Sequence, residues 1–286
     1  MKNINFIGAC SDLGVHVCGS EKGPVELTNN FNIKNYMVEK EQIEKSFDIN
    51  DLRKNEKAIN NFTKKIFDTS LNILKNDNIP LLIGGDHSCV IGSALASQKH
   101  NKNIGIIWVD AHIDYNTFET TITGNIHGLP LAAINGLCTD LTDFITSNYI
   151  NPKNTVVVGY RAKEENCDIE MENIKKMGVT VFTTDDIKKY GASNIMRQAI
   201  LIANNNTNGI HVSLDLDVID PLIAPGVSIP EYDGITDSQM YEIVDEVIKN
   251  KDIVKSIDLV EFNPDLDFED KTKNIALNII KKISIG

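Results

Sequence analysis

A chain of 286 residues with 42% hydrophobic and 24% charged side chains has the composition of a globular protein, which excludes the disordered and fibrous classes. Its formal net charge of −12 argues against a nucleic-acid partner, because phosphate binding needs a basic face. The chain has five scattered cysteines without a CxxC pair, and it shows no signal-peptide pattern. It also lacks an apolar run of roughly 18 residues. These features predict a cytoplasmic protein with no membrane partner.

Short runs rich in Ile, Val and Leu alternate with amphipathic stretches along the chain. The predicted strands cover residues 4–9, 79–86, 104–111, 155–160, 179–184, 210–218 and 254–262. The predicted helices cover residues 58–75, 164–177, 193–205, 236–249 and 272–283. Several strands are almost continuously apolar, which is typical of strands covered on both faces. The alternation predicts one α/β domain over residues 1–286, a three-layer αβα fold with a mostly parallel central sheet; residues 21–57 have weak periodicity and stay unassigned.

Polar residues follow three of these strands at the point where each strand ends. They are His87 after the second strand, Asp110, His112 and Asp114 after the third, and Asp215 and Asp217 after the sixth. The carboxyl ends of parallel strands form the binding crevice of such sheets. Within each set, residues two apart share a face of extended backbone. We therefore expect all six side chains to converge on one rim.

Each of these segments also has a simpler interpretation. A lone Asp-x-Asp is most often a solvated loop or a helix cap, and the GGDH segment could be a tight turn in which Gly84 and Gly85 are needed for positive φ. Converging carboxylates without a counterion would repel one another, and divalent cations remove that conflict. Four Asp and two His without a thiolate favour manganese, with iron, cobalt or nickel as possible substitutes.

The sequence also resembles a known family. The motifs that carry the resemblance are residues 84–88 (GGDHS), 110–128 (DAHIDYNTFETTITGNIHG), 213–221 (SLDLDVIDP), 224–226 (APG) and 260–264 (VEFNP). They are similar to those of the ureohydrolases, and within that family to those of the arginases, and the likeness covers nearly the whole chain. It implies an arginase-like fold and a homo-oligomer, a trimer or a hexamer.

The resemblance also implies two Mn²⁺ ions and a role for each ligand. His87, Asp110, Asp114 and Asp215 would bind one ion, and Asp110, His112, Asp215 and Asp217 the other, so that Asp110 and Asp215 bridge the pair. A shared water would lose its proton near neutral pH and attack as a metal-bridging hydroxide. Three catalytic residues are expected: Asp114 to orient the hydroxide, Glu261 to pair with the guanidinium, and His127 to protonate the leaving amine.

The resemblance assigns the substrate as well. Asn116, Thr121 and Thr123 would hydrogen-bond the α-carboxylate of a small guanidino substrate, so hydrolysis of L-arginine to L-ornithine and urea is the first hypothesis. Alternatives are an agmatinase, a guanidinobutyrase or a formimidoylglutamase, or a catalytically weak metal-binding homologue. A Thr-rich loop can also be plain polar surface.

Two places in the chain depart from the arginase pattern. Where arginases have an Asp that receives the α-ammonium and then a Glu, this chain has Glu164 and Cys167. Glu164 keeps a carboxylate that is one methylene longer, so we expect it to bind the ammonium. Where the family has a Gly-Thr pair, this chain has Ser228 and Ile229. Ile229 lacks the hydroxyl that helps to orient Glu261, a loss expected to cost roughly tenfold or more in activity.

Overall fold

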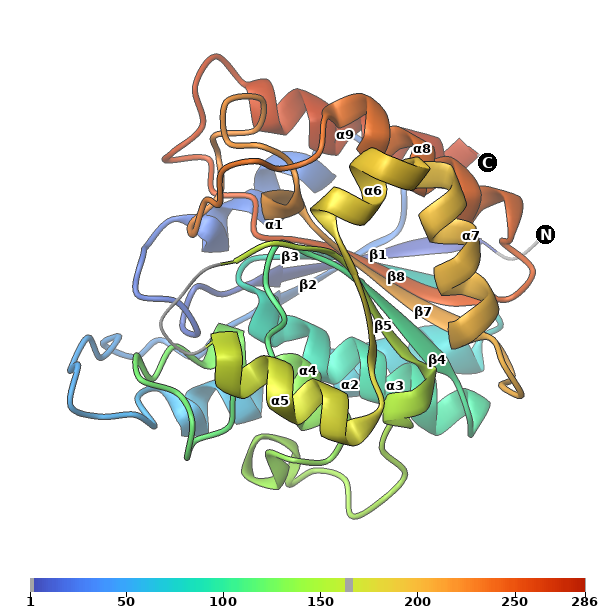
Figure 1. The fold of residues 1–286 in the computed structure, drawn as a ribbon. Helices are drawn as coiled ribbons and strands as arrows, with labels where there is room; N and C mark the ends of the chain where they lie inside the picture. The colour runs from blue at the N-terminus through green and yellow to red at the C-terminus, as the bar shows by residue number, and fades with distance from the viewer. Residues whose placement is uncertain (1–2, 163–166, 286) are drawn as a thin grey trace.

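A computed structural model describes residues 3–162 and 167–285, and in these ranges eight parallel strands form one sheet (Figure 1). The strands are β1 (Ile4–Cys10), β2 (Asn35–Glu39), β3 (Ile79–Gly84), β4 (Gly105–Val109), β5 (Thr155–Tyr160), β6 (Thr180–Thr183), β7 (Ile210–Asp215) and β8 (Val254–Val260). Their order across the sheet is β2-β1-β3-β8-β7-β4-β5-β6. Every recorded pairing is parallel, which confirms the predicted αβα class.

Helices cover both faces of the sheet. One layer holds α1 (Gly23–Thr28), α6 (Thr184–Tyr190), α7 (Ala192–Ala203), α8 (Asp237–Lys249) and α9 (Lys271–Ile285). The other holds α2 (Glu56–Lys75), α3 (Val90–Asn101), α4 (Pro130–Ile134) and α5 (Cys167–Met177) (Figure 1). The strands are buried between two apolar cores, which explains their nearly continuous runs of Ile, Val and Leu.

Local sequence explains why individual helices form where they do. In α2 the buried side chains, among them Ile59, Phe62 and Ile66, recur at helical spacing and pack against the sheet. Burial of a side chain such as Phe62 contributes about 1.5–3 kcal/mol. Helix α8 begins at a capping box, in which the hydroxyl of Thr236 accepts from the backbone of Gln239 and the Gln239 side chain accepts from Thr236.

Two parts of the fold differ from the sequence-based expectation. Residues 21–57 contain the short helix α1 and the edge strand β2. Val38 is the only buried residue of β2, so the sequence of this strand shows no alternation of apolar and polar side chains. Helix α3 was not predicted, because all of its residues from Val90 to Gln98 are buried and it therefore shows no polar stripe. Within the described ranges, no helix has the length and apolar character needed to cross a membrane.

The arrangement brings together four strands that are distant in sequence. Strands β3, β8, β7 and β4 are neighbours at the centre of the sheet. Because they are parallel, their carboxyl ends lie at one edge. Asp215 is the last residue of β7, and the segments that follow β3, β8 and β4 carry His87, Glu261 and Asp110.

Candidate metal centre

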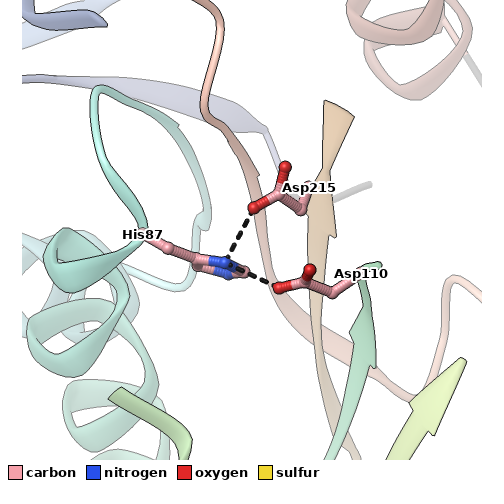
Figure 2. Close-up of side chains that lie close together, drawn as sticks. All are labelled: His87, Asp110 and Asp215. Atoms are coloured by element: carbon pink, nitrogen blue, oxygen red, sulfur yellow. Dashed lines mark ion pairs between the residues drawn. The ribbon is translucent and has the colours of Figure 1, made fainter. Parts of the chain in front are cut away.

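His87 is at the centre of the first cluster. Its Nδ1 atom lies 3.0 Å from Asp110 Oδ2, 2.9 Å from Asp215 Oδ2 and 3.2 Å from Asp114 Oδ2. Figure 2 shows Asp110 and Asp215 approaching the ring from separate strands. Although these oxygens are close, Nδ1 makes no hydrogen bond of acceptable geometry and is buried. A buried nitrogen lone pair that faces three carboxylate oxygens is the donor set of a divalent-cation site.

A second cluster adjoins the first. His112 Nδ1 lies 2.9 Å from Asp217 Oδ2 and 3.4 Å from Asp110 Oδ1. His87, Asp110 and Asp215 form one group whose ligand atoms lie within 4.8 Å of one another, and Asp110, His112 and Asp217 form another. Asp110 belongs to both groups, one oxygen toward each, as a bridging ligand requires. The residues present therefore fit two divalent cations.

Backbone geometry fixes the orientation of these ligands. Asp110 Oδ1 accepts the backbone N–H of His112 at 2.6 Å, and its Oδ2 accepts Trp108 Nε1 at 2.9 Å. Asp215 Oδ1 accepts the backbone N–H of Asp217 at 2.8 Å. Each carboxylate is thus held by local hydrogen bonds that follow from the two-residue spacing.

Further contacts orient the His87 ring. Its Nε2 lies 2.9 Å from Ser213 Oγ, and the ring stacks on Trp108 with centroids 3.9 Å apart. A hydrogen bond at the distal nitrogen fixes the tautomer of a ligating histidine. Ser213 and Trp108 precede the Asp ligands of their strands by two residues, and this position on the same face was a signal in the sequence that we had not used.

The GGDH turn owes its shape to close packing of backbones. A Cβ atom on Gly85 would collide with the carbonyl oxygen of Ser11. Neither Gly84 nor Gly85 has positive φ, so the interpretation that this turn needs its glycines for positive φ was wrong. Asp86 caps the following turn by accepting the backbone N–H groups of Ser88 and Gly14, both at 2.9 Å. The glycine is needed because β3 and the segment after β1 meet here.

The crowding of carboxylates shifts their protonation. Burial and the neighbouring Asp110 raise the pKa of Asp114 to about 6. Burial and the charge of nearby carboxylates also raise the pKa of Asp215 and of Asp217. Burial acts against the charge of His87, but the three carboxylates that face its Nδ1 atom outweigh burial and raise its pKa. Divalent cations would replace these shared protons and neutralise the same charge.

Glu261 and His127 lie beside this cluster. Glu261 Oε1 accepts the backbone N–H of His87 at 2.8 Å and lies 3.0 Å from His127 Nδ1. Its other oxygen, Oε2, is buried and has no hydrogen-bond partner among the described residues. Burial acts against the charge of His127, but the hydrogen bond with Glu261 raises its pKa to about 9. The site therefore holds a protonated imidazole and a carboxylate oxygen available to a cationic group.

Strained backbone coincides with these residues. Glu261 has φ 66° and Asp114 has φ 52°, both in the left-handed region that costs a residue other than glycine about 1–3 kcal/mol. The fold opposes this strain with backbone contacts. Glu261 N–H donates to Gly85 at 2.8 Å, and the Asp114 carbonyl accepts the N–H groups of Leu131 and Ala132 at the start of α4.

A small pocket opens next to the cluster, with a cavity volume of about 40 Å³. The residues that line it are His112, Ile113, Asp114, Asn116, His127, Gly128, Ala162, Glu170 and Ile229. Of the residues expected to bind an α-carboxylate, Asn116 lines this pocket. Thr121 is buried and its hydroxyl accepts the N–H of Gly124 at 3.1 Å, while Thr123 is exposed and its hydroxyl accepts the N–H of Asn125 at 3.2 Å.

The pocket contains one buried carboxylate that the sequence analysis missed. Glu164 and the Cys167 side chain lie outside the described residues. Glu170 on α5 is buried, lines the pocket, and accepts the backbone N–H of Tyr115 at 3.0 Å. Its position one helical turn before the buried Ile174 was a signal that it faces inward.

Comparisons with known proteins agree with this geometry. The sequence model of the Arginase family matches residues 2–286. The chain is 33% identical to an arginase of Brevibacillus brevis, with 99% of this chain and 97% of that protein covered. It superimposes on the structure of the arginase from Bacillus caldovelox with a TM-score of 0.89 at 30% identity, covering 100% and 99% of the two chains. It also superimposes on an Entamoeba histolytica arginase in complex with L-ornithine, with a TM-score of 0.90 at 28% identity, covering 99% of both.

Proposed function

We propose that this chain, which belongs to the arginase family and is a hydrolase of C–N bonds in linear amidines, converts L-arginine and water into L-ornithine and urea. The observation that carries the proposal is the buried Oε2 atom of Glu261, which has no hydrogen-bond partner among residues 3–162 and 167–285. A guanidinium is the cation whose planar N–H groups match a carboxylate. Glu261 would hold the guanidinium carbon beside the two metal clusters.

The ligand set of His87, Asp110, His112, Asp114, Asp215 and Asp217 would hold two cations, and its mixture of carboxylate and imidazole favours Mn²⁺. When bound, divalent cations lower the pKa of a coordinated water, which would make hydroxide available as the nucleophile near neutral pH.

The side chains of the protein would perform the remaining tasks. Asp114 would orient the attacking water through a carboxylate oxygen. Glu261 would hold the guanidinium in place, so that its carbon is already positioned for attack by the water. His127 would then donate its proton to the departing amine, because its raised pKa keeps it charged at neutral pH.

Two polar groups in the pocket support arginine over other guanidino compounds. Asn116 would donate to a carboxylate, and Glu170 would accept from an ammonium. Arginine carries both groups. Agmatine has only the ammonium, guanidinobutyrate has only the carboxylate, and formimidoylglutamate lacks a free ammonium. A site that uses both residues therefore selects arginine.

The test is a substrate panel with purified, manganese-loaded protein. We expect urea from arginine, and far less product from agmatine, guanidinobutyrate or formimidoylglutamate, the last assayed as formamide. Glu170→Gln should raise the KM for arginine about 10- to 100-fold through the loss of one charged contact. Glu172→Gln, two residues along the same helix and 72% exposed, is the matched control and should change nothing. Turnover of agmatine without turnover of arginine would overturn the proposal.

A further inference from the structure

The two ring nitrogens of His112 have different surroundings. Nδ1 faces the carboxylates of the second cluster, whereas Nε2 is buried and has no hydrogen-bond partner in the part of the chain that the structure describes. A cation held by His112 would take the lone pair of Nδ1, so the neutral ring would carry its proton on Nε2. A ligating histidine normally donates that N–H to a carboxylate, a carbonyl or a water. The metal-binding tautomer of His112 therefore needs an acceptor at Nε2.

Glu231 provides a carboxylate on this side of the ring. Its Oε1 lies 4.0 Å from His112 Nε2, and its side chain is only 25% exposed. A displacement of about 1 Å would bring the two atoms to hydrogen-bond distance. A change of this size lies within the rotamer freedom of a glutamate on a fixed backbone.

The backbone that carries Glu231 is fixed by Arg161. The guanidinium of Arg161 donates to the carbonyl oxygens of Asp217 at 2.7 Å, Val218 at 2.9 Å, Glu231 at 2.8 Å and Tyr232 at 3.0 Å. One side chain thus joins the turn that holds the ligand Asp217 to the segment that holds Glu231. The backbone of Glu231 and the turn that carries Asp217 are consequently held in one arrangement.

We propose that Glu231 is a positioning residue for the second metal subsite, where it accepts the Nε2–H of His112 and selects the tautomer that leaves Nδ1 free to bind a cation. This inference rests on the metal centre of the proposed function and not on the identity of the substrate. Arg161 contributes by holding Glu231 and Asp217 in register.

The test measures metal binding, independently of activity. Protein stripped with a chelator is titrated with Mn²⁺ in a calorimeter for the wild type, Glu231→Ala, Glu231→Gln and Asp233→Asn. We expect wild type to bind two ions, and Glu231→Ala to lose about 10- to 100-fold in affinity for one of them, as other outer-sphere partners do. Gln keeps an acceptor oxygen and should lose less.

Asp233→Asn is the matched control, because it removes one charge from the same exposed segment at a left-handed position that Asn tolerates. We expect it to bind both ions as the wild type does. If Asp233→Asn lost as much Mn²⁺ affinity as Glu231→Ala, the change in net charge alone would explain both losses, and the inference would be overturned. Two ions bound with unchanged affinity by Glu231→Ala would overturn it while leaving the metal centre intact. Fewer than two ions in wild type would overturn both.

A second readout reports the tautomer itself. In Zn²⁺-loaded, ¹⁵N-histidine-labelled protein, which is diamagnetic, we expect a slowly exchanging His112 Nε2–H proton resonance. Glu231→Ala should lose this resonance to fast exchange with water, and Glu231→Gln should retain it. A protected Nε2–H in Glu231→Ala would show that another group accepts the hydrogen bond, and the assignment to Glu231 would be wrong.

Discussion

Replacing Glu261 by Gln removes a charge from the site with almost no change of shape. The amide oxygen can still accept the backbone N–H of His87, which Glu261 Oε1 accepts at 2.8 Å. The amide nitrogen then stands where the unpartnered Oε2 was, and it presents a donor to a guanidinium that itself has only donors.

The size of the effect follows from the loss of a buried charge pair. Removing one partner of such a pair costs about 3–5 kcal/mol. At about 1.4 kcal/mol for each factor of ten, kcat/KM for arginine should fall roughly 100- to 3000-fold. The pKa of His127 should also fall below its value of about 9, since the carboxylate that raises it is gone. His127 would then lose its proton at a lower pH than in wild type.

The assay combines steady-state kinetics at saturating Mn²⁺, the metal content of each protein, and an NMR titration of His127. Asp265→Asn is the control, because Asp265 is a half-exposed acid four residues further along, paired with Lys22 at 2.5 Å, and its loss should change kcat/KM less than twofold. A Glu261→Gln enzyme within tenfold of wild type, with both ions bound, would refute the role given to Glu261.

Four further results are expected. Asp114→Asn should fold normally and lose most activity, because it removes the carboxylate near His87 that would orient water; near wild-type turnover would contradict this. Chelation should lower the melting temperature by several degrees, since cations at 100 times their Kd contribute about 2.7 kcal/mol to the free energy of unfolding. Metal affinity should fall from pH 8 to pH 6, because protons compete with the cations at His87 and His112, whose pKa values are raised. Calorimetry in two buffers that shows no proton release on metal binding would refute the pH prediction. Ile229→Thr should raise kcat, because it adds to the pocket the hydroxyl that the family resemblance implies for orienting Glu261, and an unchanged rate would count against that account.

The αβα class could be predicted because its cause lies in local sequence. A strand buried on both faces must be apolar along its length, and a helix on the sheet must have one apolar stripe. The edge strand at 35–39 and the fully buried α3 lack these patterns, so their prediction failed for physical reasons. The order of the strands, with β8 between β3 and β7, depends on long-range pairing that no local pattern contains.

The candidate site divides in the same way. Asp110 and His112 come together as their alternate spacing after a strand predicts, and Asp215 holds the N–H of Asp217 for the same reason. Glu170 and Glu231 could not be found by such spacing, because neither directly follows a strand and each reaches the site only through tertiary packing.

The place of β8 in the sheet has a consequence for biosynthesis. Residues 254–260 are synthesised after both β3 and β7, yet they fill the central gap between these two strands (Figure 1). Until β8 is inserted, no strand joins β3 to β7, and Glu261 has not yet reached its position beside His87. The segments that carry His87, Asp215 and Glu261 can therefore reach their common arrangement only after β8 has been made and inserted between β3 and β7.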